Sequence, residues 1–192
     1  MLHPDDALAA PTIVLIDDDE HVLAAAARLL RTSQLTVLPT TDIDQALEWL
    51  HTRDVAVLVT DFNMPRMDGL ELISIARREQ PSTVRVLMTG QNALETAIEA
   101  INRGEVFRYV HKPFEGAKFR SVITDALTRH RELAVALAER HEALRRERYL
   151  ESIELTHPGI CAIDRDVDGY YIVPEVCNAV ASRLLGFDGR TA

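Results

Sequence analysis

Short apolar runs alternate with longer stretches of helical periodicity along the first two thirds of the chain. Apolar residues recur at the three- and four-residue spacing of an amphipathic helix over residues 22–30 and 94–101. Parallel strands need a crossover connection, so this alternation predicts an α/β protein with a doubly wound parallel sheet. The runs that we expect to form strands are residues 13–16, 35–38, 55–59, 84–88 and 106–110.

Residues that begin and end helices lie between these runs. Asp42 precedes an amphipathic stretch, and its carboxylate can accept hydrogen bonds from the free amide groups of a first helical turn. Pro81 is predicted to stop the third helix, and Gly104 to end the fourth. Together with a helix after the last run, these residues predict five strands and five helices.

The fifth helix is predicted to run far beyond the sheet. Residues 117–156 contain neither glycine nor proline. Near its start, Phe119, Val122 and Ile123 form a face that we expect to dock on the sheet. A solvated single helix of this length would have marginal stability, because packing normally supplies the stability of helices.

The later part of this helix carries an imperfect coiled-coil pattern. Leu133, Leu137 and Leu144 have heptad-compatible spacing, whereas Arg140 and Glu147 occupy the other seam positions. We expect residues 129–156 to form a homodimeric coiled coil. Packing within one chain is the alternative.

A small region follows the long helix. Pro158 and Gly159 break the helix, and residues 166–169 are a turn between two short strand-like runs, which predicts a hairpin. A last amphipathic helix is expected from Pro174. Residues 159–164 and 178–187 also resemble the opening of a PAS sensor domain. We prefer a small cap, because so few residues rarely form an independent core.

Composition narrows the classes of function. The chain has 192 residues, 47% of them hydrophobic and 27% charged, as in a soluble globular protein. A formal net charge of −9 argues against nucleic-acid binding. Two cysteines, Cys161 and Cys177, give no disulfide framework. The amino terminus lacks a signal-peptide pattern and no run approaches about 20 apolar residues, so a cytoplasmic protein is expected.

Polar residues with phosphate and metal chemistry follow the predicted strands. Because the carboxyl ends of parallel strands meet at one edge of a sheet, these side chains are expected to lie together. Like charges about 4 Å apart repel by about 4 kcal/mol at an effective dielectric constant of 20, and Mg²⁺ removes such a conflict. The residues are Asp17 and Asp18 after the first run, Asp61 after the third, Thr89 after the fourth, and Lys112 with Pro113 after the fifth.

The order of these residues resembles the receiver domain of two-component response regulators. Residues 61–69, Asp-Phe-Asn-Met-Pro-Arg-Met-Asp-Gly, match the loop after the phosphorylated aspartate of that family. Residues 101–109 also resemble receivers that precede cyclic-dinucleotide phosphodiesterase or hydrogenase-regulator modules. The resemblance implies a flavodoxin-like sheet with strand order 2-1-3-4-5. Together with the helical pattern after it, the resemblance divides the chain into a tail (1–11), a receiver domain (12–128), the coiled-coil extension (129–156) and a C-terminal region (157–192).

The resemblance also assigns roles at the acidic end of the site. It implies that Asp61 accepts a phosphoryl group from a cognate histidine kinase, with Mg²⁺ as cofactor. Asp18, Asp61 and the backbone carbonyl of Asn63 would bind the metal ion directly. Asp17 would hold a coordinated water molecule.

The remaining roles concern the phosphoryl group and the switch. The resemblance implies that Lys112 pairs with the phosphoryl oxygens and that the peptide bond before Pro113 is cis. Thr89 would move toward the new phosphoryl group. Tyr109 would then rotate into the space that Thr89 leaves.

These expectations describe a phosphorylation-controlled signalling protein rather than an enzyme, apart from catalysis of its own phosphorylation and dephosphorylation. Its expected contacts are a histidine kinase, a second copy of itself and an unknown downstream protein, without nucleic acid or membrane. Alternatives are an N-terminal fragment of a larger regulator, a scaffold that has lost phosphorylation, and an aspartyl-phosphate phosphohydrolase. The last needs a second acid two residues after the nucleophile, where this chain has Asn63.

Overall fold

The structure is a computed structural model that describes residues 10–31, 34–90, 94–156, 164–165 and 171–172. The chain forms two compact units, residues 1–137 and residues 138–192. The predicted receiver domain falls within the first unit. The predicted limits at residues 128 and 156 stay a prediction.

The first unit is built on a five-stranded sheet in which neighbouring strands are all parallel, in the order β2-β1-β3-β4-β5. This confirms the predicted fold class and strand order. The strands are β1 (Thr12–Ile16), β2 (Thr36–Thr40), β3 (Val55–Asp61), β4 (Val84–Thr89) and β5 (Arg108–His111).

Two strands differ in position from the prediction. β2 begins at Thr36 and extends to Thr40, with Pro39 inside it. Proline is tolerated there because β2 lies at the edge of the sheet, where a missing N–H breaks no ladder. β5 begins at Arg108 rather than at Val106, which is buried among the helices on one face of the sheet.

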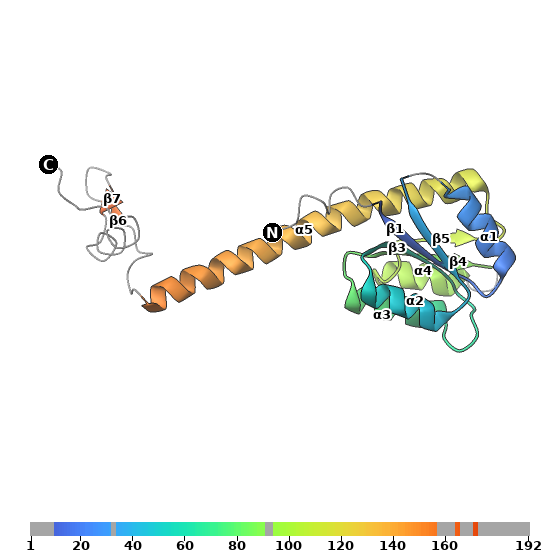
Figure 1. Ribbon diagram of the computed structural model, residues 1–192, viewed down its shortest axis with the longest axis horizontal. Coiled ribbons are helices and arrows are strands. Elements are labelled where there is room, and N and C mark those ends of the chain that lie inside the picture. The colour runs from blue at the N-terminus through green and yellow to red at the C-terminus, as the bar shows by residue number, and fades with distance from the viewer. Residues whose placement is uncertain (1–9, 32–33, 91–93, 157–163, 166–170, 173–192) are drawn as a thin grey trace. The chain divides into compact units, whose positions relative to one another are not determined.

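Helices cover both faces of the sheet (Figure 1). The central strand β3 is buried along its whole length, as expected for a parallel strand between two helical layers. One core cluster joins the sheet to α1 and α5, and the other joins it to α2, α3 and α4. The helices are α1 (Glu20–Leu29), α2 (Ile43–Thr52), α3 (Gly69–Glu79), α4 (Leu94–Asn102) and α5 (Gly116–Thr156).

Aspartates cap three of these helices. The predicted cap of α2 is confirmed, because the Asp42 carboxylate accepts a hydrogen bond from the Asp44 amide at 2.9 Å. Asp19 caps α1 in the same way. Asp68 begins α3 in a reciprocal capping box with Glu71, which fixes where the loop after β3 turns into the helix.

The long fifth helix is present, because α5 contains 41 residues and ends at Thr156. Phe119 and Ile123 are buried against the sheet and Val122 is partly buried there, as predicted, and Ala126 is buried as well. The contact with the sheet extends further along the helix than predicted, since Leu133, which was expected at a coiled-coil position, packs against this core. Within the described part of the chain, no helix has both the length and the hydrophobicity to cross a bilayer.

In the second unit, β6 (Asp164–Arg165) pairs with β7 (Tyr171–Ile172) in an antiparallel arrangement at the place of the predicted hairpin. The helix predicted from Pro174 lies outside the described residues. Cys161 and Cys177 lie outside them as well.

The amino edge of the sheet is fixed by neutral hydrogen bonds around Gln80. Its side-chain nitrogen donates to the carbonyls of Leu50 and Arg53, the latter at 2.6 Å. Its side-chain oxygen accepts from the amide of Val55 at 3.0 Å. The Thr83 hydroxyl lies 2.7 Å from the Val55 carbonyl, so α2, α3, β3 and the start of β4 are tied together here.

Candidate functional site

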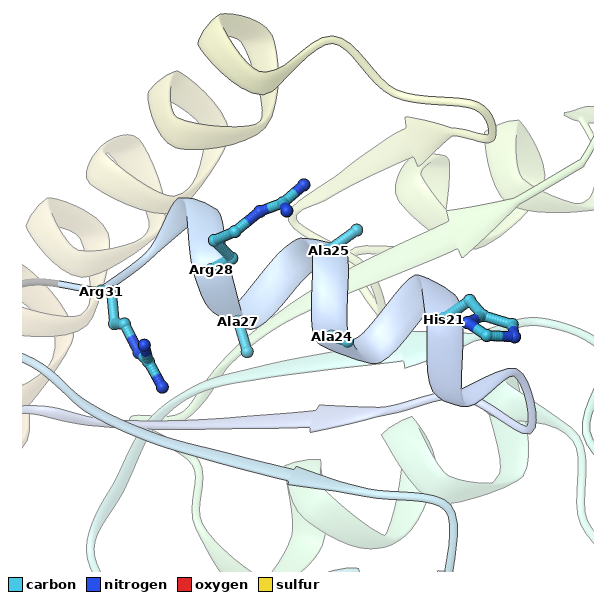
Figure 2. Close-up of a pocket in the computed structure, with 6 residues that line it drawn as sticks. All are labelled: His21, Ala24, Ala25, Ala27, Arg28 and Arg31. Carbon is cyan, nitrogen blue, oxygen red and sulfur yellow. The ribbon is translucent and has the colours of Figure 1, made fainter.

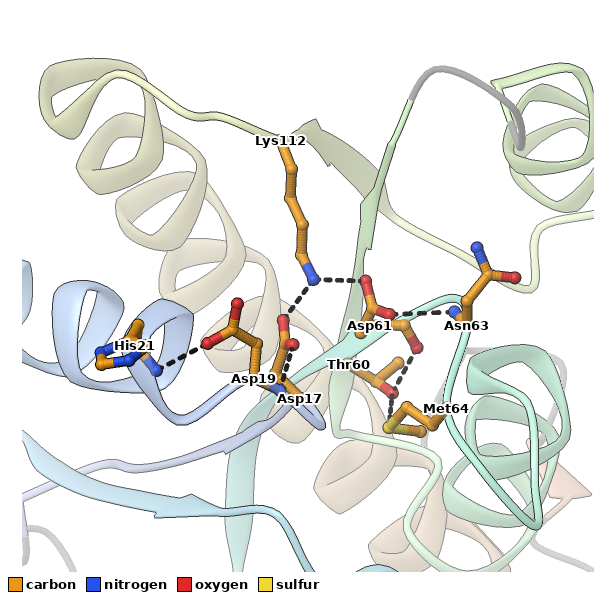
Figure 3. Close-up of polar contacts among 8 residues, drawn as sticks. All are labelled: Asp17, Asp19, His21, Thr60, Asp61, Asn63, Met64 and Lys112. Carbon is orange, nitrogen blue, oxygen red and sulfur yellow. Dashed lines mark hydrogen bonds and ion pairs between the residues drawn. The ribbon is translucent and has the colours of Figure 1, made fainter.

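The carboxyl edge of the sheet brings together the polar residues that follow the strands. Asp17, Asp61 and Thr89 are buried, and Asp18 is exposed. Lys112 reaches the same edge from the end of β5 (Figure 3). A parallel sheet places these residues together because each of them ends its strand in the same direction.

Lys112 bridges the two buried carboxylates. Its Nζ lies 2.5 Å from Asp17 Oδ2 and 2.6 Å from Asp61 Oδ1 (Figure 3). Asp17 Oδ2 has this close ion pair but no hydrogen bond of acceptable geometry, although it is buried. The contact between Lys112 and Asp17 Oδ2 is therefore an ion pair. Asp17 Oδ2 can still accept a hydrogen bond from a further partner.

Backbone amides fix the other oxygens of the two carboxylates. Asp17 Oδ1 accepts a hydrogen bond from the Asp19 amide at 3.0 Å. Asp61 Oδ2 accepts one from the Asn63 amide at 3.0 Å. Each buried carboxylate therefore has one oxygen held by the backbone and one facing Lys112, which sets its orientation.

Burial and pairing shift the ionisation of this cluster. Burial raises the pKa of Asp17, because desolvation disfavours its charged form more strongly than Lys112 and the Asp19 amide favour it. Burial alone would lower the pKa of Lys112, but its close contacts with the carboxylates of Asp17 and Asp61 raise it overall. Lys112 is thus a charged amine held between acids.

The acid cluster has the composition of a divalent-cation site. Ligand oxygens of Asp17, Asp18 and Asp61 all lie within 4.8 Å of one another. One Lys112 charge cannot neutralise three carboxylates. Hard oxygen donors in this number, one of them a buried oxygen without a hydrogen bond, fit Mg²⁺ better than softer metal ions.

The loop after β3 returns close to the phosphoacceptor candidate. Gly69 lies so near the Asp61 carbonyl that a Cβ there would clash with it and would lie 3.2 Å from Leu87 Cδ1. The Thr60 hydroxyl donates to the Asp61 carbonyl at 3.0 Å (Figure 3). Glycine at position 69 is therefore required by the close approach of two backbones.

The two predicted switch residues lie at different depths. The buried Thr89 hydroxyl donates to the Gly90 carbonyl at 3.0 Å. Tyr109 is 36% exposed and lines a surface cavity of about 470 Å³ between β5 and α5, together with His111 and Val122. The peptide bond between Lys112 and Pro113 is cis.

Another surface hollow lies on α1, away from the acid cluster (Figure 2). Its volume is about 440 Å³, and it is lined by His21, Ala24, Ala25, Ala27, Arg28 and Arg31. None of the acid-cluster residues lines this hollow. The candidate site is therefore defined by convergent charges and not by the size of a cavity.

Sequence reasoning missed one ion pair beside the site. Arg66 in the loop after β3 pairs with Asp44 in the first turn of α2. The two residues are 22 positions apart, and each alone looks like an ordinary exposed charge. No sequence pattern indicates this contact.

Comparison with protein families matches residues 13–124 to the response regulator receiver domain. Among curated relatives, the DNA-binding transcriptional regulator NtrC of Azospirillum brasilense is 30% identical over 71% of this chain and 28% of its own length. The C4-dicarboxylate transport regulator DctD of Pseudomonas aeruginosa is 32% identical over 70% of this chain and 30% of its own length. This chain thus matches less than a third of each relative.

Solved structures are similar over the same region. A crystal structure described as an adenylate cyclase from Rhodopirellula baltica has a TM-score of 0.64 and 30% identity, covering 70% of this chain and 98% of that one. The signal receiver domain of an HD domain-containing protein from Pseudomonas fluorescens has a TM-score of 0.61 and 32% identity, covering 65% and 92%. Family, fold and strand order agree, and the chain belongs to the receiver-domain family of two-component response regulators.

Proposed function

We propose that this chain is a Mg²⁺-dependent phosphoacceptor that a histidine kinase phosphorylates on Asp61. The observation that carries the proposal is the bridge from Lys112 to Asp17 and Asp61, with Asp18 completing the acid cluster. Buried acids normally occur with partners that compensate their charge. Here the compensation is incomplete, as expected for a site that awaits a cation.

Asp18, Asp61 and the Asn63 carbonyl would bind Mg²⁺, and Asp17 would hold one of its water molecules. The ion would neutralise charge on the phosphoryl oxygens and the nearby carboxylates. The Asn63 amide and Lys112 orient the Asp61 carboxylate from either side.

Asp61 would act as the nucleophile. One carboxylate oxygen forms a bond to phosphorus while the phosphorus–nitrogen bond of the kinase phosphohistidine breaks, and the imidazole keeps the electron pair. The product is an acyl phosphate. Lys112 then pairs with a phosphoryl oxygen, because it already lies 2.6 Å from the accepting carboxylate. Hydrolysis of the acyl phosphate by water releases phosphate and restores Asp61. In this proposal the chain catalyses its own phosphorylation and dephosphorylation and no other reaction.

The buried Thr89 hydroxyl and the partly exposed Tyr109 would form the switch. A phosphoryl group adds acceptor oxygens, and Thr89 would exchange its bond to the Gly90 carbonyl for one of them. Tyr109 lines the cavity beside α5, so its rotation would alter the surface of β5 and α5. The readout is a change in protein contacts.

The extension of α5 would carry a homodimer contact. Large apolar side chains remain exposed along it, including Val135 (58%), Tyr149 (65%) and Leu155 (83%). Large apolar side chains that stay exposed on a long solvated helix are typical of a surface that a second helix covers. If phosphorylation controls this contact, cysteine crosslinking along residues 137–155 changes when beryllofluoride is added. Identical crosslinking with and without beryllofluoride would show that phosphorylation does not control the dimer contact.

Two alternatives to this function differ in how well they fit the site. A phosphohydrolase of the aspartyl-phosphate type needs an acid two residues after the nucleophile, and Asn63 stands there. An N-terminal part of a larger regulator is compatible with the small fraction of each curated relative that the chain matches. That alternative keeps the phosphoacceptor role and changes only the output.

Treatment with acetyl phosphate and Mg²⁺ tests the proposal, with intact mass and oligomeric size measured on the same samples. Wild type is expected to gain one phosphoryl group, and Asp61→Asn none. The exposed Asp54 provides a matched control, since Asp54→Asn should behave as wild type. A phosphoryl gain by Asp61→Asn would place the acceptor elsewhere, and no gain by wild type would remove the function.

A further inference from the structure

The loop between β3 and α3, residues 62–68, is fixed at both ends by backbone hydrogen bonds. The Phe62 amide donates to the Met88 carbonyl at 2.9 Å, and the Gly69 amide donates to the Phe62 carbonyl at 3.0 Å. These bonds close the loop but leave its middle to other contacts. The proposed metal ligand, the carbonyl of Asn63, lies within this loop.

The middle of the loop has an unusual backbone. Arg66 has a φ of 75°, and within the described residues it is the one residue other than glycine with positive φ. That conformation is unfavourable for a residue with a Cβ atom, and it persists where surrounding contacts maintain it. Such outliers gather at functional sites more often than elsewhere.

A two-pronged ion pair maintains this conformation. Arg66 Nη1 donates to Asp44 Oδ2 at 3.1 Å, and Nη2 donates to Asp44 Oδ1 at 3.2 Å. Two parallel bonds between a guanidinium and a carboxylate fix orientation as well as distance. Asp44 belongs to the first turn of α2, which Asp42 caps, so the loop is tied to a rigid helix.

The ion pair lies beside the acid cluster. Arg66 and Asp18 line the same cavity of about 160 Å³, together with Met64 and Asp42. The cavity joins the loop after β3 to the start of α2 and to the expected metal ligand that follows β1. A shift of the loop would therefore move Asn63 relative to Asp18 and Asp61.

We propose that Arg66 is a positioning residue that raises the affinity of the site for Mg²⁺ by holding the Asn63 carbonyl in place through Asp44. This inference rests on the proposed function, because it assumes that the acid cluster binds the metal ion. Arg66 does not bind the metal ion or the phosphoryl group itself.

If only the charge of Arg66 mattered, Arg66 would lower the affinity for Mg²⁺ rather than raise it. A cation near three carboxylates repels a metal ion, so neutralising Arg66 should tighten Mg²⁺ binding if only Coulomb forces act. If the loop contact dominates, the same change weakens binding. The sign of the effect therefore separates the two explanations.

Isothermal titration of Mg²⁺ into the full chain, without phosphodonor, provides the test. Arg66→Gln is expected to bind Mg²⁺ about threefold more weakly than wild type, the size of effect expected when an exposed ion pair is lost. Arg66→Lys keeps the charge but cannot form the two-pronged contact, so it should also bind more weakly. Arg31→Gln makes the same charge change at the opposite edge and should match wild type.

Binding by Arg66→Gln that equals or exceeds that of wild type would overturn the inference. Unchanged binding by Arg66→Lys would do so as well, because the charge and not the geometry would then be responsible. Thermal unfolding in EDTA shows whether each variant is folded. If wild type itself does not bind Mg²⁺, or if Asp61→Asn binds it equally well, the proposed function fails and not merely the role of Arg66.

Discussion

The two edges of the sheet differ in how their polar groups are satisfied. At the amino edge, Gln80 and Thr83 satisfy backbone groups with neutral hydrogen bonds. At the carboxyl edge, Asp17, Asp61 and Lys112 gather charges that remain incompletely compensated. Neutral, satisfied networks stabilise a fold, whereas concentrated charge makes a site that a ligand can stabilise. The concentrated, incompletely compensated charge therefore lies at one edge of the sheet, although backbone packing stabilises both edges.

The largest expected effect comes from adding a methyl group at the carboxyl edge. Gly69→Ala places a Cβ against the Asp61 carbonyl, so the backbone must move. We expect a loss of about 3 kcal/mol in the free energy of unfolding, measured with urea. Gly90→Ala is the control, because a Cβ there meets no atom within 4 Å. Equal stabilities for both variants would show that the close approach is not rigid.

At the amino edge, Gln80→Ala should cost about 2–3 kcal/mol of unfolding free energy, since it leaves the Val55 amide and the Arg53 carbonyl without their partner. Phosphorylation of the folded variant should equal that of wild type. Gln45→Ala removes an exposed glutamine from α2 and should change stability little. If Gln80→Ala impaired phosphorylation in folded protein, the chemistry at the carboxyl edge would depend on contacts at the amino edge.

Asp17→Asn should increase the free energy of unfolding, and the size of this increase should depend on pH. A raised pKa means that ionised Asp17 destabilises the folded state above that pKa, and the penalty disappears as the pH falls through it. Without Mg²⁺ at neutral pH, we expect the variant to gain about 1 kcal/mol of stability. The gain should shrink toward acid pH, and stabilisation by Mg²⁺ should decrease.

Urea titrations across pH, with and without Mg²⁺, measure both quantities. Asp54→Asn is the matched control, because it removes an exposed carboxylate. A constant difference between Asp17→Asn and wild type at every pH would argue against the raised pKa as its cause.

The most local effect is expected where the extension of α5 begins. His130 Nδ1 lies 2.8 Å from the Ser82 carbonyl at the amino edge, where α5 continues beyond the residues matched to the family. His130→Ala should lose about 1 kcal/mol, the usual value of one hydrogen bond. Hydrogen exchange should accelerate first near residues 128–134. His141→Ala, on the exposed part of α5, should leave this protection unchanged.

The pattern of apolar residues predicts the central strands of the sheet, because each buried parallel strand is a continuous apolar run. β1, β3 and β4 occur where such runs predict them. The ends of β2 and β5 were misplaced, because an edge strand containing Pro39 and the buried Val106 before β5 follow tertiary packing and not local pattern. The cap at Asp42 was predictable, since capping involves only neighbouring residues.

The sequence by itself determined which carboxylates, hydroxyl and amine end the strands, because a parallel sheet brings every strand end to one edge. Only the tertiary structure decided how deeply Asp17 is buried, that Lys112 bridges it to Asp61, and that Arg66 pairs with Asp44. Burial and long-range ion pairs depend on how distant segments pack, and no local spacing encodes that packing.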